Sequence, residues 1–141
     1  MRSRSKARDI ALKVLYEIDQ TGHLQGVVLE QRCHDQLLES NLIEFAQEIV
    51  SGVVEHTTQL DKFIAQYAPE WPLDQVAVID RNILRIALWE VAIYKKTPLK
   101  VGINEAIELA KIYGSDSSSR FINGVLGSLA DHLDNIVTSF S

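Results

Sequence analysis

Apolar residues recur three and four positions apart along most of the chain, which is the spacing of one face of an α-helix. In the first stretch, about 5–20, they are Ala7, Ile10, Ala11, Val14, Leu15 and Ile18. The same period covers about 26–39, 41–67, 73–94 and 98–113, and it returns after a serine-rich turn at 115–119. The pattern predicts an all-α protein of about six or seven helices.

The segment 73–94 is the most hydrophobic part of the sequence. A helix that is apolar on most sides is buried at the centre of a fold. Arg81, Asn82 and Arg85 share one face of this predicted helix, where Arg85 could also bond a buried carboxylate. Glu90 lies roughly opposite Arg81, so a buried Glu90 requires a partner.

Two prolines mark the clearest break in the helical pattern, because Pro69 and Pro72 flank Trp71. We therefore predict one domain over 1–141, built from two packed helical bundles. Its N-terminal helical lobe covers about 1–68 and its C-terminal helical lobe about 73–138. The Trp71 indole is expected to fill their junction.

Local signals predict how the helices begin and end. The pair Thr57-Thr58 is expected to bend or divide the third helix. Thr97-Pro98 has the form of a cap followed by a first-turn proline. The tail, 135–141, is expected to fray.

Composition narrows the class of protein. The chain has 141 residues, of which 46% are hydrophobic and 23% charged, so it can bury a core. No apolar run reaches the ~18 residues of a membrane span, and no signal-peptide block follows the basic N-terminus. We therefore expect a soluble, cytoplasmic protein without a membrane partner. The single cysteine, Cys33, excludes an internal disulfide.

Catalytic signatures are absent from the sequence. It has no phosphate-binding loop, no dinucleotide fingerprint and no zinc motif. Adjacent helical residues point to different sides, so Cys33-His34 is interpreted as a core cysteine beside a surface histidine. Glu105 and Glu108 could mimic a carboxylate pair, but on an amphipathic helix we expect them to be solvated or paired with neighbours such as Lys111. We predict no catalytic residue, no metal, no cofactor and no enzymatic activity.

The net charge of −5 hides an asymmetry along the chain. Residues 1–13 carry five basic groups and one acid, whereas residues 14–80 carry two basic groups and twelve acids. Residues 81–120 carry seven basic groups and four acids. Affinity for a polyanion follows the local patch rather than the total, so an acidic protein can still bind nucleic acid. A basic tail on an ordinary solvated face is the alternative interpretation.

A basic surface that could bind nucleic acid is the remaining candidate for a functional site. Arginine and lysine neutralise phosphates, and aromatic rings stack on unpaired bases. Phe121 follows the serine-rich turn at a helix start, although core packing would equally explain that ring. The candidate groups are Arg2, Arg4, Lys6, Arg8, Arg81, Arg85, Arg120 and Phe121.

Four segments together resemble the NusB family of bacterial transcription antitermination factors. The most specific is PLKVGINEAIELAK at 98–111, followed by RFINGVL at 120–126. Upstream, IDRNILRIALWE at 79–90 and ARDIALKVLY at 7–16 also fit. The resemblance covers nearly the whole chain.

The resemblance implies an all-helical protein of two bundles that is not an enzyme. It implies binding to the single-stranded boxA element of nascent RNA, together with NusE, the tenth small-subunit ribosomal protein. The complex joins RNA polymerase and other Nus factors and suppresses termination, notably in ribosomal RNA operons.

The same resemblance assigns roles to particular residues. It makes the N-terminal arm an RNA contact, although Ser3 and Ser5 interrupt the denser arginine run of the family and predict a shallower salt dependence. It adds the turn as a second RNA-contacting region and predicts that all these groups converge on one RNA face. The RNA-binding residues so implied are Arg4, Lys6 and Arg8 of the arm and Ser117, Ser118, Arg120 and Phe121 of the turn. Tyr16 and Asp80 match positions that face the ribosomal-protein partner, and Arg81 could serve either surface.

Three alternatives remain open at the level of sequence. A helical scaffold that binds only protein would show no dependence on salt and no cross-link to RNA. Similar domains begin ribosomal RNA cytosine methyltransferases, but no glycine-rich cofactor loop is present, so we do not expect that activity. A homodimer could hide one helix face and compete with the partner.

Overall fold

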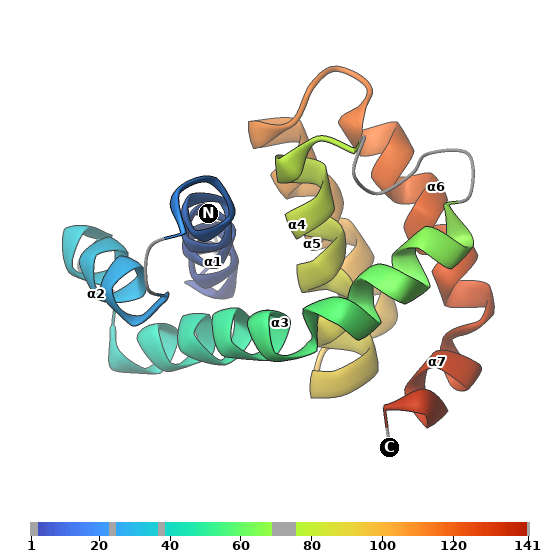
Figure 1. Cartoon of the computed structure of the whole chain (residues 1–141), viewed down its shortest axis with the longest axis horizontal. Helices are drawn as coiled ribbons and strands as arrows, with labels where there is room; N and C mark the ends of the chain where they lie inside the picture. The colour runs from blue at the N-terminus through green and yellow to red at the C-terminus, as the bar shows by residue number, and fades with distance from the viewer. Residues whose placement is uncertain (1–2, 23–24, 37–38, 69–75, 141) are drawn as a thin grey trace. The chain divides into compact units, whose positions relative to one another are not determined.

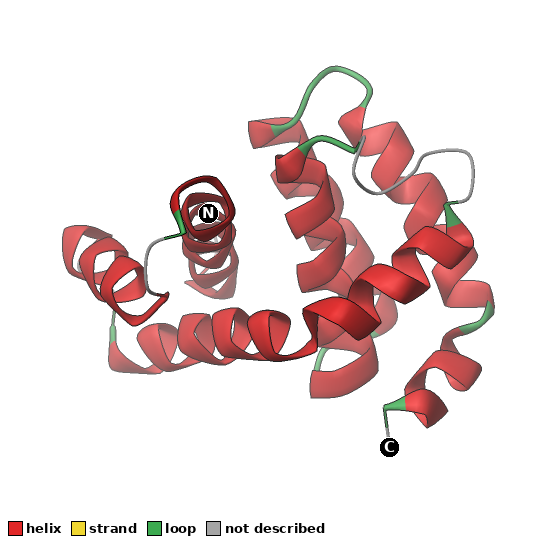
Figure 2. Cartoon of the chain, viewed as in Figure 1, coloured by secondary structure: helices red, strands yellow, loops and turns green. Residues whose placement is uncertain are grey.

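The computed structural model describes residues 3–22, 25–36, 39–68 and 76–140. Within these ranges the chain is helical and contains no strand, which confirms the predicted all-α class (Figure 2). The elements in Figure 1 are α1 (Ser3–Thr21), α2 (Gln25–Gln36), α3 (Ser40–Tyr67), α4 (Val78–Trp89), the π-helical turn η2 (Glu90–Tyr94), α5 (Leu99–Tyr113), α6 (Ser118–Asp131) and α7 (Leu133–Ser139). Helix α3 continues without interruption through Thr57 and Thr58, so the pair does not divide it.

The chain forms two compact units, Met1–Glu55 and His56–Ser141, which meet inside α3. This division differs from the predicted lobe boundary at Pro69 and Pro72. Those prolines and Trp71 lie outside the described residues. The second half of α3 belongs to the second unit, where Asp61 accepts a hydrogen bond from Arg85 and the Phe63 ring lies against the Phe140 ring.

The first unit is built from α1, α2 and the first half of α3. Their apolar stripes bury the side chains of Ile10, Leu12, Val14, Val28 and Ile49. Cys33 is also buried, as predicted. At the edge of the α1–α2 contact, Arg32 Nη2 lies 3.2 Å from Glu17 Oε1.

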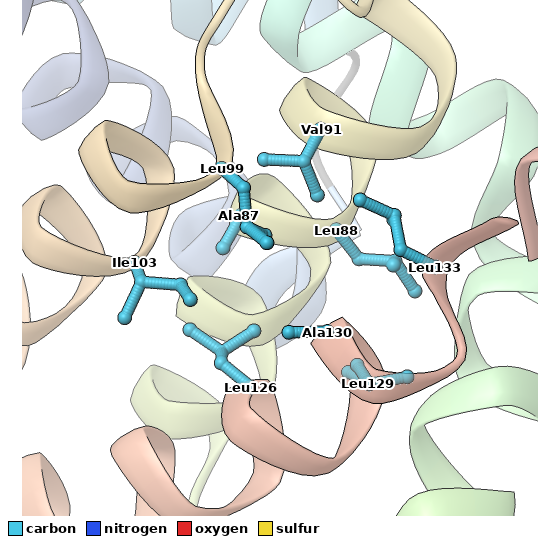
Figure 3. A pocket seen from close by; sticks show the side chains of 9 residues that line it. All are labelled: Ala87, Leu88, Val91, Leu99, Ile103, Leu126, Leu129, Ala130 and Leu133. Carbon is cyan, nitrogen blue, oxygen red and sulfur yellow. The ribbon is translucent and has the colours of Figure 1, made fainter.

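The second unit is organised around α4, which packs against α5 and α6. Ile83, Leu84 and Leu88 of α4 are at most 1% exposed, which confirms that the most hydrophobic segment is central. A small apolar pocket remains beside α4, and Figure 3 shows the side chains around it, which come from α4, η2, α5, α6 and α7. The pocket is lined by Ala87, Leu88, Val91, Leu99, Ile103, Leu126, Leu129, Ala130 and Leu133.

A polar clamp joins the second half of α3 to α4. Arg85 Nε donates to Asp61 Oδ1 and Nη2 donates to Asp61 Oδ2, both at 2.7 Å. Arg85 Nη1 also donates to Asn82 Oδ1 at 3.1 Å. Arg85 therefore bonds a carboxylate, which is the structural alternative that the sequence analysis left open. Its guanidinium is held inside the protein.

Glu90 begins the π-helical turn and is only 1% exposed. Its Oε2 accepts a hydrogen bond of 2.8 Å from Thr97 Oγ1, so the expected partner exists. The prediction that Thr97 caps α5 is wrong, because its hydroxyl is directed to Glu90. Pro98 occupies the N-cap position instead and supplies no side-chain hydrogen bond.

The prediction of a frayed tail is also wrong. Residues 133–139 form α7, and Ile136 is completely buried. The Phe140 ring lies 5.5 Å from the Phe63 ring and 6.0 Å from the His56 ring, measured between centroids. Burial of apolar surface stabilises a short helix that its own propensity would not.

Candidate nucleic-acid interface

The basic arm lies on the first turns of α1, and its members differ in exposure. Arg4 and Lys6 are exposed, whereas Arg8 is 4% exposed. The guanidinium carbons of Arg4 and Arg8 lie 4.1 and 5.4 Å from the centroid of the Phe45 ring. Arg8, predicted as an RNA contact, is therefore covered by the protein because it lies on the α1 face that packs inward. Arg2 lies outside the described residues.

The serine-rich turn and the first turns of α6 carry three groups that solvent reaches fully or in part. Ser117 and Arg120 are exposed, and Phe121 is half-buried. The partial exposure of Phe121 fits neither a fully buried core ring nor a free one. An exposed guanidinium beside a half-exposed ring can bind a phosphate and stack on an unpaired base.

Ser118 differs from its neighbours because it is 1% exposed. Its Oγ donates to Asp80 Oδ2 at 3.0 Å and accepts from the Ser115 backbone N–H at 2.9 Å. The Ser118 hydroxyl, which was predicted to contact RNA, is therefore hydrogen-bonded inside the protein. It fixes the turn that carries Ser117 and Arg120.

Gly114 makes this turn possible. It follows the end of α5, as predicted, and its φ of −86° is one that any residue can adopt. A Cβ at this position would lie 2.5 Å from both Cβ and Oγ of Ser118 and 2.7 Å from the Ala110 carbonyl oxygen. The glycine is required for close approach rather than for a left-handed conformation.

Asp80 lies in the first turn of α4 and is 8% exposed. Its Oδ1 is buried without a hydrogen-bond partner among the described residues. Burial raises the pKa of Asp80, and the hydrogen bond from Ser118 opposes that rise. The predicted partner-facing carboxylate is therefore mostly covered, whereas Tyr16, its predicted companion, is 41% exposed.

The Ser118–Asp80 hydrogen bond brings the first turns of α6 and α4 together, although 38 positions separate the two residues. Arg81 follows Asp80 and is half-buried. The arm belongs to the first unit and the turn to the second, so each is described by itself. Sequence reasoning missed Phe45, because a phenylalanine in an apolar stripe has the pattern of an ordinary core residue.

Other kinds of site receive no support from the described ranges. No group of three or more metal-ligating side chains occurs there. None of the helices described is both long and apolar enough to cross a membrane. Lys111 lies 3.5 Å from Glu108, the surface pair expected from their spacing.

These features define a helical protein with exposed cationic groups, and comparison with known proteins identifies its family. The NusB family profile matches residues 5–131. The chain belongs to the NusB family. Its relatives are transcription antitermination proteins rather than enzymes, so family membership supports the prediction of a non-catalytic antitermination factor.

Relatives match over most of their length. The chain is 47% identical over 128 residues to the transcription antitermination protein NusB of Chloroflexus aggregans, covering 89% of this chain and 85% of the relative. It is 45% identical over 131 residues to NusB of Dehalococcoides mccartyi strain CBDB1, covering 93% and 92%.

Solved structures agree with the fold. T. maritima NusB superposes with a TM-score of 0.84 at 32% identity, covering 91% of this chain and 90% of that one. A crystal structure of antitermination factors NusB and NusE in complex with dsRNA gives 0.85 at 26% identity, covering 94% and 98%.

Proposed function

We propose that this protein binds the single-stranded boxA element of nascent transcripts together with NusE, the tenth small-subunit ribosomal protein. In this role it acts within the RNA polymerase antitermination complex, with other Nus factors, in the cytoplasm. Membership of the NusB family supports the proposal, and the solved complex of a similar NusB with NusE and dsRNA supports the pairing with NusE and an RNA partner.

The observation that carries the RNA role is the turn before α6. Exposed Ser117 and Arg120 lie next to half-buried Phe121, and buried Ser118 fixes the backbone between them. Arg120 supplies charge for a phosphate, and the Phe121 ring supplies a face for a base. Arg4 and Lys6 add exposed charge on α1.

An anisotropy titration with a boxA RNA tests this function. Arg120→Gln should weaken binding and lower the slope of log affinity against log salt by about 0.7, the value for one phosphate contact on a single strand. Lys62→Gln removes an exposed lysine of α3 and serves as the matched control, with no expected change. Equal affinity of Arg120→Gln and the parent at all salt concentrations would remove the turn from the site.

The nature of the RNA is tested in the same assay. The proposal expects tighter binding to single-stranded boxA than to a duplex of the same sequence, and further tightening when NusE is added. Preference for the duplex would contradict the single-strand assignment. Salt-independent association with NusE and no RNA binding would instead favour the protein-only scaffold.

The proposed partner surface includes Tyr16 of α1, a residue that is 41% exposed. Asp80 acts beneath the surface, where its carboxylate orders the turn through Ser118. Tyr16→Ala should reduce co-purification with NusE and leave RNA binding by the protein alone unchanged. Undiminished co-purification would discard Tyr16 as a contact.

A further inference from the structure

The first turns of α1 are helical although the charges of their side chains oppose helix formation. Arg4, Lys6 and Arg8 lie there, and the first turn contains no acidic residue. Cations near a helix N-terminus oppose the helix dipole, and like charges four positions apart repel each other. The helix nevertheless begins at Ser3, so contacts outside it must stabilise this end.

The Phe45 ring, contributed by α3, provides such a contact. Both guanidinium groups lie within 6 Å of its centroid, at 4.1 Å for Arg4 and 5.4 Å for Arg8. The face of an aromatic ring carries negative potential and attracts cations at these distances. Phe45 is 2% exposed, so the ring is held rigidly by the first unit.

The two arginines differ in what they can reach. Arg8 is 4% exposed, so its charge is covered by the protein, whereas Arg4 is exposed and lies closer to the ring. Because Arg4 is exposed, its guanidinium is accessible to a phosphate, which arginine recognises through charge and hydrogen bonds.

We propose that Phe45 is the positioning residue of the arm. Its ring places Arg4 for contact with an RNA phosphate, and Arg8 holds α1 to the first unit without contacting RNA. This inference rests on the proposed RNA-binding function, and it adds a division of labour within the arm.

The positioning itself is tested without RNA, by NMR of the arginine side chains. Protons above a ring face shift to lower frequency, so the Nε–H and Cδ–H signals of Arg4 and Arg8 should be displaced in the parent. Phe45→Leu should return them toward ordinary positions, whereas Phe45→Tyr, which keeps the ring, should preserve the displacement. Undisplaced signals in the parent would overturn the proposal even if the protein binds RNA.

The consequence for binding is tested by anisotropy with boxA RNA. Phe45→Leu should weaken binding about threefold to tenfold, the range that one lost cation–π contact supports. Phe63→Leu, which shortens an aromatic residue in the second unit, is the control and should bind like the parent. Unchanged affinity of Phe45→Leu, with displaced signals lost, would show that Phe45 orders the arm but does not serve binding. Failure of the parent to bind RNA would refute the proposed function and leave the NMR result to decide the positioning.

A second pair of variants separates the two arginines and does not depend on Phe45→Leu folding. Methionine preserves the apolar stem of arginine and removes its charge. Arg4→Met should lower the salt slope by about 0.7, whereas Arg8→Met should leave the slope unchanged and lower the unfolding midpoint. Equal losses of slope in the two variants would overturn the division of labour.

Discussion

In the clamp between Arg85 and Asp61, replacement of Asp61 should lower the unfolding free energy more than replacement of Arg85. Two hydrogen bonds of 2.7 Å join the groups, and Asn82 accepts a third from the guanidinium at 3.1 Å. The Arg85 side chain is 9% exposed and the Asp61 side chain 26%. Asp61→Ala leaves a buried guanidinium without its carboxylate, whereas Arg85→Met leaves a carboxylate that water can reach.

The expected magnitudes follow from this difference. Removing one partner of a fully buried ion pair costs about 3–5 kcal/mol of unfolding free energy. Because this pair is partly exposed, we expect a loss of about 2–3 kcal/mol for Asp61→Ala and about 1–2 kcal/mol for Arg85→Met. The double variant should lose about 1–2 kcal/mol less than the sum, because each single variant already removes the shared contact.

Urea-induced unfolding of the parent, both single variants and the double variant measures these terms. Lys111→Gln removes the exposed pair with Glu108, in which the two side chains are 59% and 64% exposed. It is the control and should change the unfolding free energy by less than about 0.5 kcal/mol. Additivity of the two single changes within about 0.5 kcal/mol, or a larger loss for Arg85→Met than for Asp61→Ala, would refute the reasoning.

Three further predictions concern the second unit. Gly114→Ala should lower the unfolding free energy by about 1–3 kcal/mol, because its Cβ would displace Ser118, and an unchanged urea midpoint would contradict the close approach. Because burial raises the pKa of Asp80, the parent should lose stability as the pH rises from below the ordinary value of 3.8 through the raised pKa. Asp80→Asn should lack this loss, so the stability of the variant relative to the parent should increase over that interval; a pH-independent difference in urea titrations would disprove the link. Leu126→Ala should lower the unfolding free energy by about 3–5 kcal/mol by enlarging the apolar pocket, and a loss below about 1 kcal/mol by the same measurement would show that the pocket collapses.

The helical core was predictable because it depends on a periodic signal. The apolar stripe of α4 predicted its burial, and the isolated acid Glu90 within it predicted an internal partner. The identity of that partner was not predictable, since Thr97 had an equally good local role as a cap. Choosing between a local and a tertiary hydrogen bond requires the fold.

The candidate site was predictable by residue type but not by exposure. Arg4, Lys6, Ser117 and Arg120 are exposed, in keeping with their predicted roles. The burial of Arg8 and Ser118 was missed because each contacts a residue distant in sequence: Arg8 lies near the Phe45 ring, and Ser118 donates a hydrogen bond to Asp80. One sequence without geometry cannot separate a residue that contacts RNA from one that orders its neighbour.

Cys33 is the only cysteine in the sequence, and it is buried in the first unit. Burial raises the pKa of the Cys33 thiol, so the reactive thiolate is scarce at neutral pH. A cysteine introduced at exposed Ser117 should therefore take up a maleimide dye or spin label selectively, with the native sulfur left in place. Because the native cysteine should not react, fluorescence and distance measurements on this protein should report only the introduced label.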